Sequence, residues 1–210
     1  MKTIKTASII ALAITGSLLF SGCTVNAGTY KNFAGETVSV PSTSGELEAA
    51  AATEKLIEVL EYSASVAKEK GYTEIADSDA SDVDTFMSVY DPESKKTAVS
   101  SDGGQTGYIV DESAITPYVM RKFVKDSSPD IMLKDNVFII SNPEVNYTLK
   151  VSTKNGLMVS AVQIVSDQSE VRVTMEYKVT DAGKALLKVA VPAPVETDAP
   201  AETTTETPAG

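Results

Sequence analysis

The chain has no histidine and a single cysteine, Cys23, among its 210 residues. Without histidine there is no imidazole to act as a general base or a metal ligand, and one thiol cannot form an internal disulfide or a thiolate cluster. Stability therefore has to come from packed apolar surface. A serine activated by lysine and a pair of catalytic carboxylates are the chemistries left, and neither has a recognisable pattern here. We predict a protein that is not an enzyme and uses no cofactor or metal ion.

Basic residues are also scarce. The chain has 18 lysines and arginines against 29 aspartates and glutamates, with a net charge of −11 at pH 7. Nucleic acid and a bare anionic bilayer are poor partners for such a surface, because like charges repel. We therefore predict no nucleic-acid partner, and any membrane attachment has to come from something other than surface charge.

The long apolar run of the sequence lies at its start. Lys2 and Lys5 precede an apolar stretch at 7–20, and small residues then lead to Cys23. This arrangement has the parts of a secretory signal, and the stretch is shorter than the roughly 20 apolar residues that span a bilayer. It resembles a bacterial lipobox, in which the cysteine thiol carries diacylglycerol and the leader is cut before it. We predict a signal peptide at 1–22 and a lipid anchor at Cys23 facing the extracytoplasmic side of the cell membrane. An ordinary cleaved signal followed by a stray thiol is the alternative.

Composition divides the remainder into three parts. Residues 23–42 are small and polar without a sustained apolar period, which predicts a flexible tether. The end of the chain, 190–210, is rich in proline and threonine and carries only acidic charges, so we expect a disordered tail that cannot bury enough apolar surface to fold. Residues 43–189 are left as one α+β domain.

That domain begins with an amphipathic helix. Thr43 and Glu46 have the spacing of a capping box, an apolar stripe with helical period follows, and Gly71 supplies the stop. A second, short helix is predicted from Thr116, with Pro117 in its first turn and its end at 128–129.

Most of the rest predicts strands. Short segments at 83–90, 97–101, 106–111 and 137–141 are bounded by turn sequences, and apolar and polar residues alternate at 147–151 and 171–179. The segment 157–165 is apolar on both faces and follows an Asn155-Gly156 hairpin turn. We predict an antiparallel meander with one apolar face, which the opening helix covers.

This order of elements is similar to that of the LolA-like lipoprotein carrier group, which includes lipoproteins of the LppX and LprG type. The resemblance lies at 147–180, where a strand, a Lys154-Asn155-Gly156-Leu157 turn, a second strand, a turn near Asp167 and a third strand follow one another. It implies a curved, open antiparallel sheet shaped like half a barrel, which wraps around helices and leaves an apolar cavity for acyl chains.

Eight residues are the candidates to line such a cavity, since they lie on the apolar faces of the predicted elements: Leu56, Leu60, Met87, Leu149, Met158, Val173, Met175 and Tyr177. The methionines are soft, unbranched side chains that suit an adaptable lipid site, although they also suit an ordinary core. The acidic string Asp77, Asp79, Asp82 and Asp84 lacks the glycine and glutamate of a calcium-binding loop, so we interpret it as a solvated loop.

Two functions from different classes remain open. The first is a non-enzymatic, membrane-anchored lipoprotein that binds a lipid or another hydrophobic ligand in the cell envelope. The second is an anchored module with a solid core that binds or scaffolds an envelope protein partner. Facing carboxylates in a cleft would instead indicate an envelope hydrolase.

Overall fold

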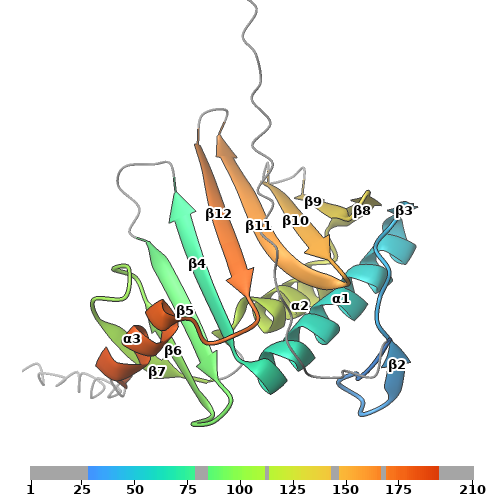
Figure 1. Ribbon diagram of the computed structural model, residues 1–210. Helices are drawn as coiled ribbons and strands as arrows, with labels where there is room; N and C mark the ends of the chain where they lie inside the picture. Colours follow the sequence, from blue (N-terminus) through green and yellow to red (C-terminus); the bar gives the residue numbers. More distant parts are fainter. Residues whose placement is uncertain (1–27, 79–84, 112–113, 143–146, 167–168, 194–210) are drawn as a thin grey trace, which may run out of the picture.

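One large, open sheet forms the centre of the molecule (Figure 1). The computed structural model describes residues 28–78, 85–111, 114–142, 147–166 and 169–193. Within them, eleven strands form this sheet, two more form a separate hairpin, and three segments are α-helical. The predicted α+β class with a large, mostly antiparallel sheet is confirmed.

The strands of the large sheet follow an order that is partly sequential. In sheet order they are β13 (Ala190–Pro192), β7 (Gly107–Val110), β6 (Lys96–Ser100), β5 (Phe86–Asp91), β4 (Tyr72–Ser78), β12 (Ser169–Glu176), β11 (Leu157–Ser166), β10 (Tyr147–Lys154), β9 (Val137–Asn142), β8 (Asp130–Lys134) and β3 (Glu46–Glu48). Neighbours are antiparallel, except for β13 and β7, which are parallel. The hairpin consists of β1 (Thr29–Lys31) and β2 (Thr37–Ser39), and the helices are α1 (Ala49–Lys70), α2 (Thr116–Ser127) and α3 (Asp181–Val189).

The predicted meander of the last third is present as β10, β11 and β12. Asn155 and Gly156 have φ values of 53° and 76°, which is the mirror-image turn that joins twisted antiparallel strands. The predicted second helix is also confirmed, with Pro117 in its first turn and a left-handed Ser128 after its end.

The predicted start of the first helix is wrong. α1 begins at Ala49, because residues 46–48 pair with β8 as the edge strand β3 instead of forming a helical turn. Thr43 does not cap the helix, since its hydroxyl donates a hydrogen bond of 2.8 Å to the side chain of Asn136. The end is as predicted: Gly71 has φ 87° and its N–H donates to the carbonyl of Ala67 at 2.9 Å.

Residues 28–42, which composition predicts to be part of a flexible tether, form a hairpin that packs on α1. The Tyr30 hydroxyl donates to the Glu58 carbonyl at 3.1 Å, and its ring lies 5.0 Å from that of Tyr62. The Val38 and Val40 side chains pack against the same small cluster. A few apolar side chains in a polar segment are thus enough to dock it.

The C-terminal boundary of the domain also differs from the prediction. The sequence pattern places a strand at 171–179 and a disordered tail from 190, whereas β12 ends at Glu176 and Thr180 caps the short helix α3. The helix is followed by β13, whose three residues pair with β7. These three residues belong to the fold because β7 offers them an edge to pair with, which composition alone does not reveal.

Different helices share apolar clusters with the two faces of the sheet. On β5, Tyr90 belongs to the apolar cluster that includes α1 and α2, whereas Met87 and Val89 belong to the cluster of Leu186 on α3. Since successive strand residues point to opposite faces, α3 lies on the other face from α1 and α2, as Figure 1 shows.

Candidate functional site

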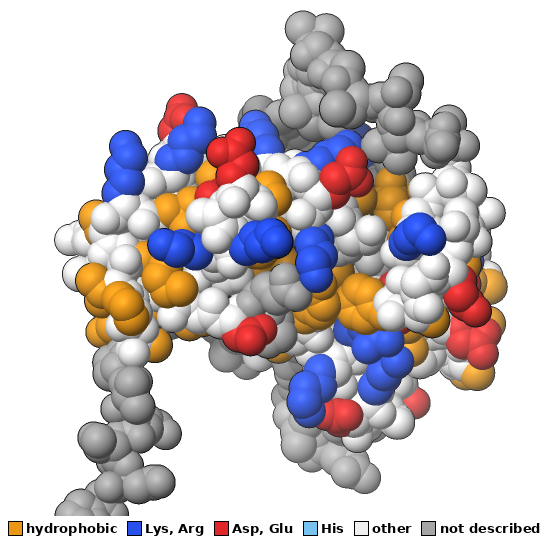
Figure 2. Space-filling view, turned by 90° about the horizontal axis from the view of Figure 1, so that it is seen from below, with side chains coloured by type: hydrophobic (Ala, Val, Ile, Leu, Met, Phe, Trp, Pro, Cys, Tyr) orange, Lys and Arg blue, Asp and Glu red, His pale blue; other side chains and the backbone are white. Residues whose placement is uncertain are grey.

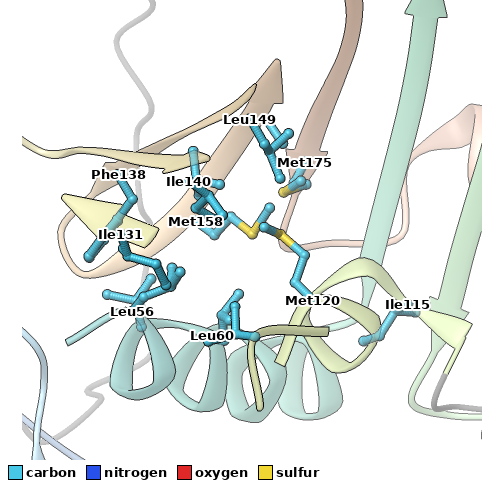
Figure 3. Packing of buried hydrophobic residues seen from close by; sticks show 14 of the residues in the cluster. Leu56, Leu60, Ile115, Met120, Ile131, Phe138, Ile140, Leu149, Met158 and Met175 are labelled. Carbon is cyan, nitrogen blue, oxygen red and sulfur yellow. The ribbon is translucent and has the colours of Figure 1, made fainter. Parts of the chain in front are cut away.

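The largest apolar cluster lies between the helix pair α1–α2 and the sheet, and we call it the helix–sheet layer. Its buried members come from α1, from α2 and from strands β4, β5 and β8 to β12. Five of the eight cavity candidates are among them, namely Leu56 and Leu60 from α1 and Leu149, Met158 and Met175 from three adjacent strands. Figure 3 shows these five pointing toward the space between helix and sheet. Val173 and Tyr177 are partly buried and pack against the same cluster.

Met87 does not join the other seven candidates. It is buried in the smaller cluster under α3, with Val89, Ala98 and Leu186. The sequence pattern marks Met87 as apolar but does not tell on which face of β5 it lies. The eight candidates therefore do not line one common space.

Three of the candidates in the helix–sheet layer are fully buried. Leu56, Leu60 and Met158 have no solvent-exposed area. Hollows lined by described residues occur at the surface instead, for example about 320 Å³ between the hairpin and α1 and about 520 Å³ over the outer side of α2. Neither is lined by any of the eight candidates.

A buried carboxylate adjoins the layer. Glu74 on β4 is only 2% exposed, and it faces the α1–α2 side together with Tyr72, because the two residues are two positions apart on one strand. The Tyr72 hydroxyl donates to the Glu74 carboxylate. The hydroxyl and the backbone N–H of Thr116, the first residue of α2, also hydrogen-bond to it. The Glu74 carboxylate on β4 therefore accepts hydrogen bonds from the N–H and hydroxyl groups at the N-terminus of α2, which have no partner within the helix.

The ionisation of these groups is shifted by their burial. Desolvation raises the pKa of Glu74 above 4.5, while the hydrogen bonds from Tyr72 and Thr116 act in the opposite direction. The pKa of Tyr72 is raised well above 10.0, first by burial and then by the charge of Glu74. Sequence reasoning missed this carboxylate because β4 was not predicted. An acidic residue on the apolar side of a Tyr-Thr-Glu-Ile-Ala strand is the signal that would have revealed it.

The acidic side chains of the described residues do not gather around Glu74. Glu74 has a tyrosine and a threonine as side-chain neighbours and no second carboxylate hydrogen-bonded to it. In the described ranges there is no group of three or more acidic or cysteine side chains placed to hold a metal ion. Of the acidic string, Asp77 is an exposed residue of β4, and Asp79, Asp82 and Asp84 lie outside the described residues.

The predicted anchor site, Cys23, and the leader before it also lie outside the described residues. None of the helices in the described part of the chain is long and apolar enough to cross a membrane. Comparison of the sequence with protein-family models and with curated protein sequences gives no match.

Proposed function

We propose that this chain is a non-enzymatic lipoprotein, anchored to the cell membrane through Cys23, whose domain binds a lipid or another hydrophobic ligand in the helix–sheet layer. The observation that carries the proposal is the convergence of seven of the eight candidates on that one layer. The sheet is open, with β13 and β3 at its two edges, which suits a sheet that wraps around helices without closing into a barrel. A curved, helix-covered sheet of the LolA-like kind is part of the same proposal.

The composition of the layer supports a site that forms when the ligand enters. Met120, Met158 and Met175 meet in it, and long unbranched thioether side chains change rotamer at little cost. A ligand would take the space that these side chains fill in its absence. Entry would also have to displace α2, which is held to α1 by Arg121 and Glu61 and to β4 by Glu74.

A second candidate is favoured by the burial of the side chains in the layer. Because Leu56, Leu60 and Met158 have no solvent-exposed area, the domain also suits an anchored module with a solid core that binds an envelope protein. Its binding surface would then lie on the outside of the molecule.

Native mass spectrometry separates these two functions. The chain without its leader, carrying Cys23→Ser so that no anchor is attached, is incubated with phosphatidylglycerol and phosphatidylethanolamine and analysed intact. The lipid-binding proposal expects added mass that resolves into lipid on denaturation. Leu60→Phe, which adds volume inside the layer, is expected to abolish that mass, and Thr174→Phe, at an exposed position of β12 on the face away from α1 and α2, is the matched control. A lipid-free mass throughout would reject the first function and favour the second.

A further inference from the structure

An exposed apolar surface extends from the turn of the hairpin onto α2, and we call it the hairpin–α2 surface. Val119 is 53% exposed and Phe33 is 40% exposed. The two are linked through Tyr118, whose ring stacks on Phe33 at 5.2 Å and whose side chain lines the hollow over α2 with Val119 and Phe123. The surface is thus continuous and not a set of scattered side chains.

Basic groups accompany this apolar surface. Lys122 and Lys125 are exposed on α2, and the Arg121 guanidinium lies 4.6 Å from the centre of the Phe33 ring. Asp126 pairs with Lys122 on the same helix. Apolar rings bordered by lysines are typical of a helix that rests at the interface between lipid headgroups and acyl chains. On the face of the molecule seen from below, Figure 2 shows hydrophobic side chains exposed beside Lys and Arg.

The length of chain before the hairpin restricts where this surface can be. The Gly28 carbonyl accepts a hydrogen bond of 2.8 Å from the N–H of Val40, so the hairpin closes at Gly28. Cys23 precedes it by five residues, and a chain reaches at most about 3.6 Å per residue. The anchor atom and Gly28 are therefore no more than about 18 Å apart. Because the hairpin packs on α1, its residues do not lengthen the connection between the anchor and the domain.

We propose that the hairpin–α2 surface lies against the bilayer, with Phe33 and Val119 at the boundary of headgroups and acyl chains and Lys122 and Lys125 among anionic headgroups. This inference rests on the proposed anchor at Cys23. The net charge of −11 opposes binding from solution, whereas an anchor makes the contact intramolecular and gives even a weak contact a high effective concentration. Docking would place α2, and with it the helix–sheet layer, next to the membrane.

The experiment uses the full lipidated protein in vesicles of phosphatidylethanolamine and phosphatidylglycerol. When Cys23 carries lipid, the wild type has no free thiol. Val119→Cys and the control Thr174→Cys therefore each introduce a unique labelling site. Thr174 is exposed on β12 and alternates with buried Met175, so it faces away from α1 and α2. Each site receives a nitroxide, and its collisions with oxygen and with a water-soluble nickel chelate are compared.

We expect the label at 119 to favour oxygen over the nickel chelate several-fold more than the label at 174. Adding Lys122→Glu and Lys125→Glu should reduce that difference. If Cys23 carries lipid and the labels at 119 and 174 are equally accessible to oxygen and to the nickel chelate, the docking is overturned but the anchor is not. A reactive Cys23 thiol in the wild-type membrane fraction would overturn the anchor, and the docking with it.

Discussion

Arg121 on α2 donates from both Nε and Nη2 to the same carboxylate oxygen, Oε1 of Glu61 on α1, at 2.8 and 2.7 Å. The same guanidinium lies over the ring of Phe33. One arginine of α2 thus contacts both α1 and the hairpin, and the side chains of Arg121 and Glu61 are each less than one-quarter exposed. Partial burial reduces the screening of the pair by water.

A double-mutant cycle with Arg121→Gln and Glu61→Gln is expected to give a coupling free energy of about 1–2 kcal/mol, because the pair is charge-assisted and partly buried. Urea unfolding of the four proteins measures it. The matched control is the exposed pair Lys122 and Asp126 on α2, for which a coupling below about 0.5 kcal/mol is expected. Equal coupling in the two cycles would contradict the role of Arg121 in joining α2 to α1.

Glu74 gives the stability a defined pH dependence. Its pKa in the folded state is raised above 4.5, so the folded protein binds the proton more tightly than the unfolded chain does. The contribution of Glu74 to the free energy of unfolding is therefore full below pH 4.5 and is lost as the pH rises through the folded pKa. We expect the stability of the wild type relative to Glu74→Gln to fall over that range in urea titrations at a series of pH values.

Tyr72→Phe provides the internal control for this assignment. The tyrosine hydroxyl donates to Glu74 and lowers its pKa, so removing it should raise the pKa and move the loss of stability to higher pH. A pH profile that is the same in wild type and Glu74→Gln would show that other groups cause the dependence.

Packing in the helix–sheet layer should dominate stability. Leu60→Ala is expected to lower the free energy of unfolding by about 2–5 kcal/mol, because a fully buried leucine leaves a cavity when truncated. Val119→Ala, on the exposed side of α2, should change it by no more than about 0.5 kcal/mol. If ligand occupies the layer, the destabilised Leu60→Ala protein should regain part of its stability when lipid is added.

The close packing of α3 on the sheet depends on Gly183. A Cβ at this position would lie 2.8 Å from both the Thr73 hydroxyl oxygen and a Val89 methyl carbon. Alanine is the better helix former by about 1 kcal/mol, yet we expect Gly183→Ala to lower the melting temperature because the clash pushes α3 off the sheet. The control Ala185→Gly, at an exposed position of the same helix, should cost about 1 kcal/mol through helix propensity alone. A higher melting temperature for Gly183→Ala would show that α3 has room to shift.

Local patterns of the sequence determined much of the secondary structure. Alternation of apolar and polar residues revealed β10 and β12, the Asn155-Gly156 turn joined β10 to β11, and Gly71 fixed the end of α1. These signals succeed because period, turn conformation and positive φ depend on residues that are adjacent in the chain. The apolar residues of the candidate site could be selected in the same way.

Only the tertiary structure decided which of these residues meet. It separated Met87 from the other candidates, since the face that a strand residue presents depends on register and on what lies opposite. Residues 46–48 form an edge strand, the hairpin at 28–42 packs on α1, and β13 extends the sheet. Each of these segments pairs or packs with residues that are distant in the sequence, which a local pattern does not reveal. The tertiary structure also buried Glu74 against Thr116, a contact between residues whose separation no local pattern can report.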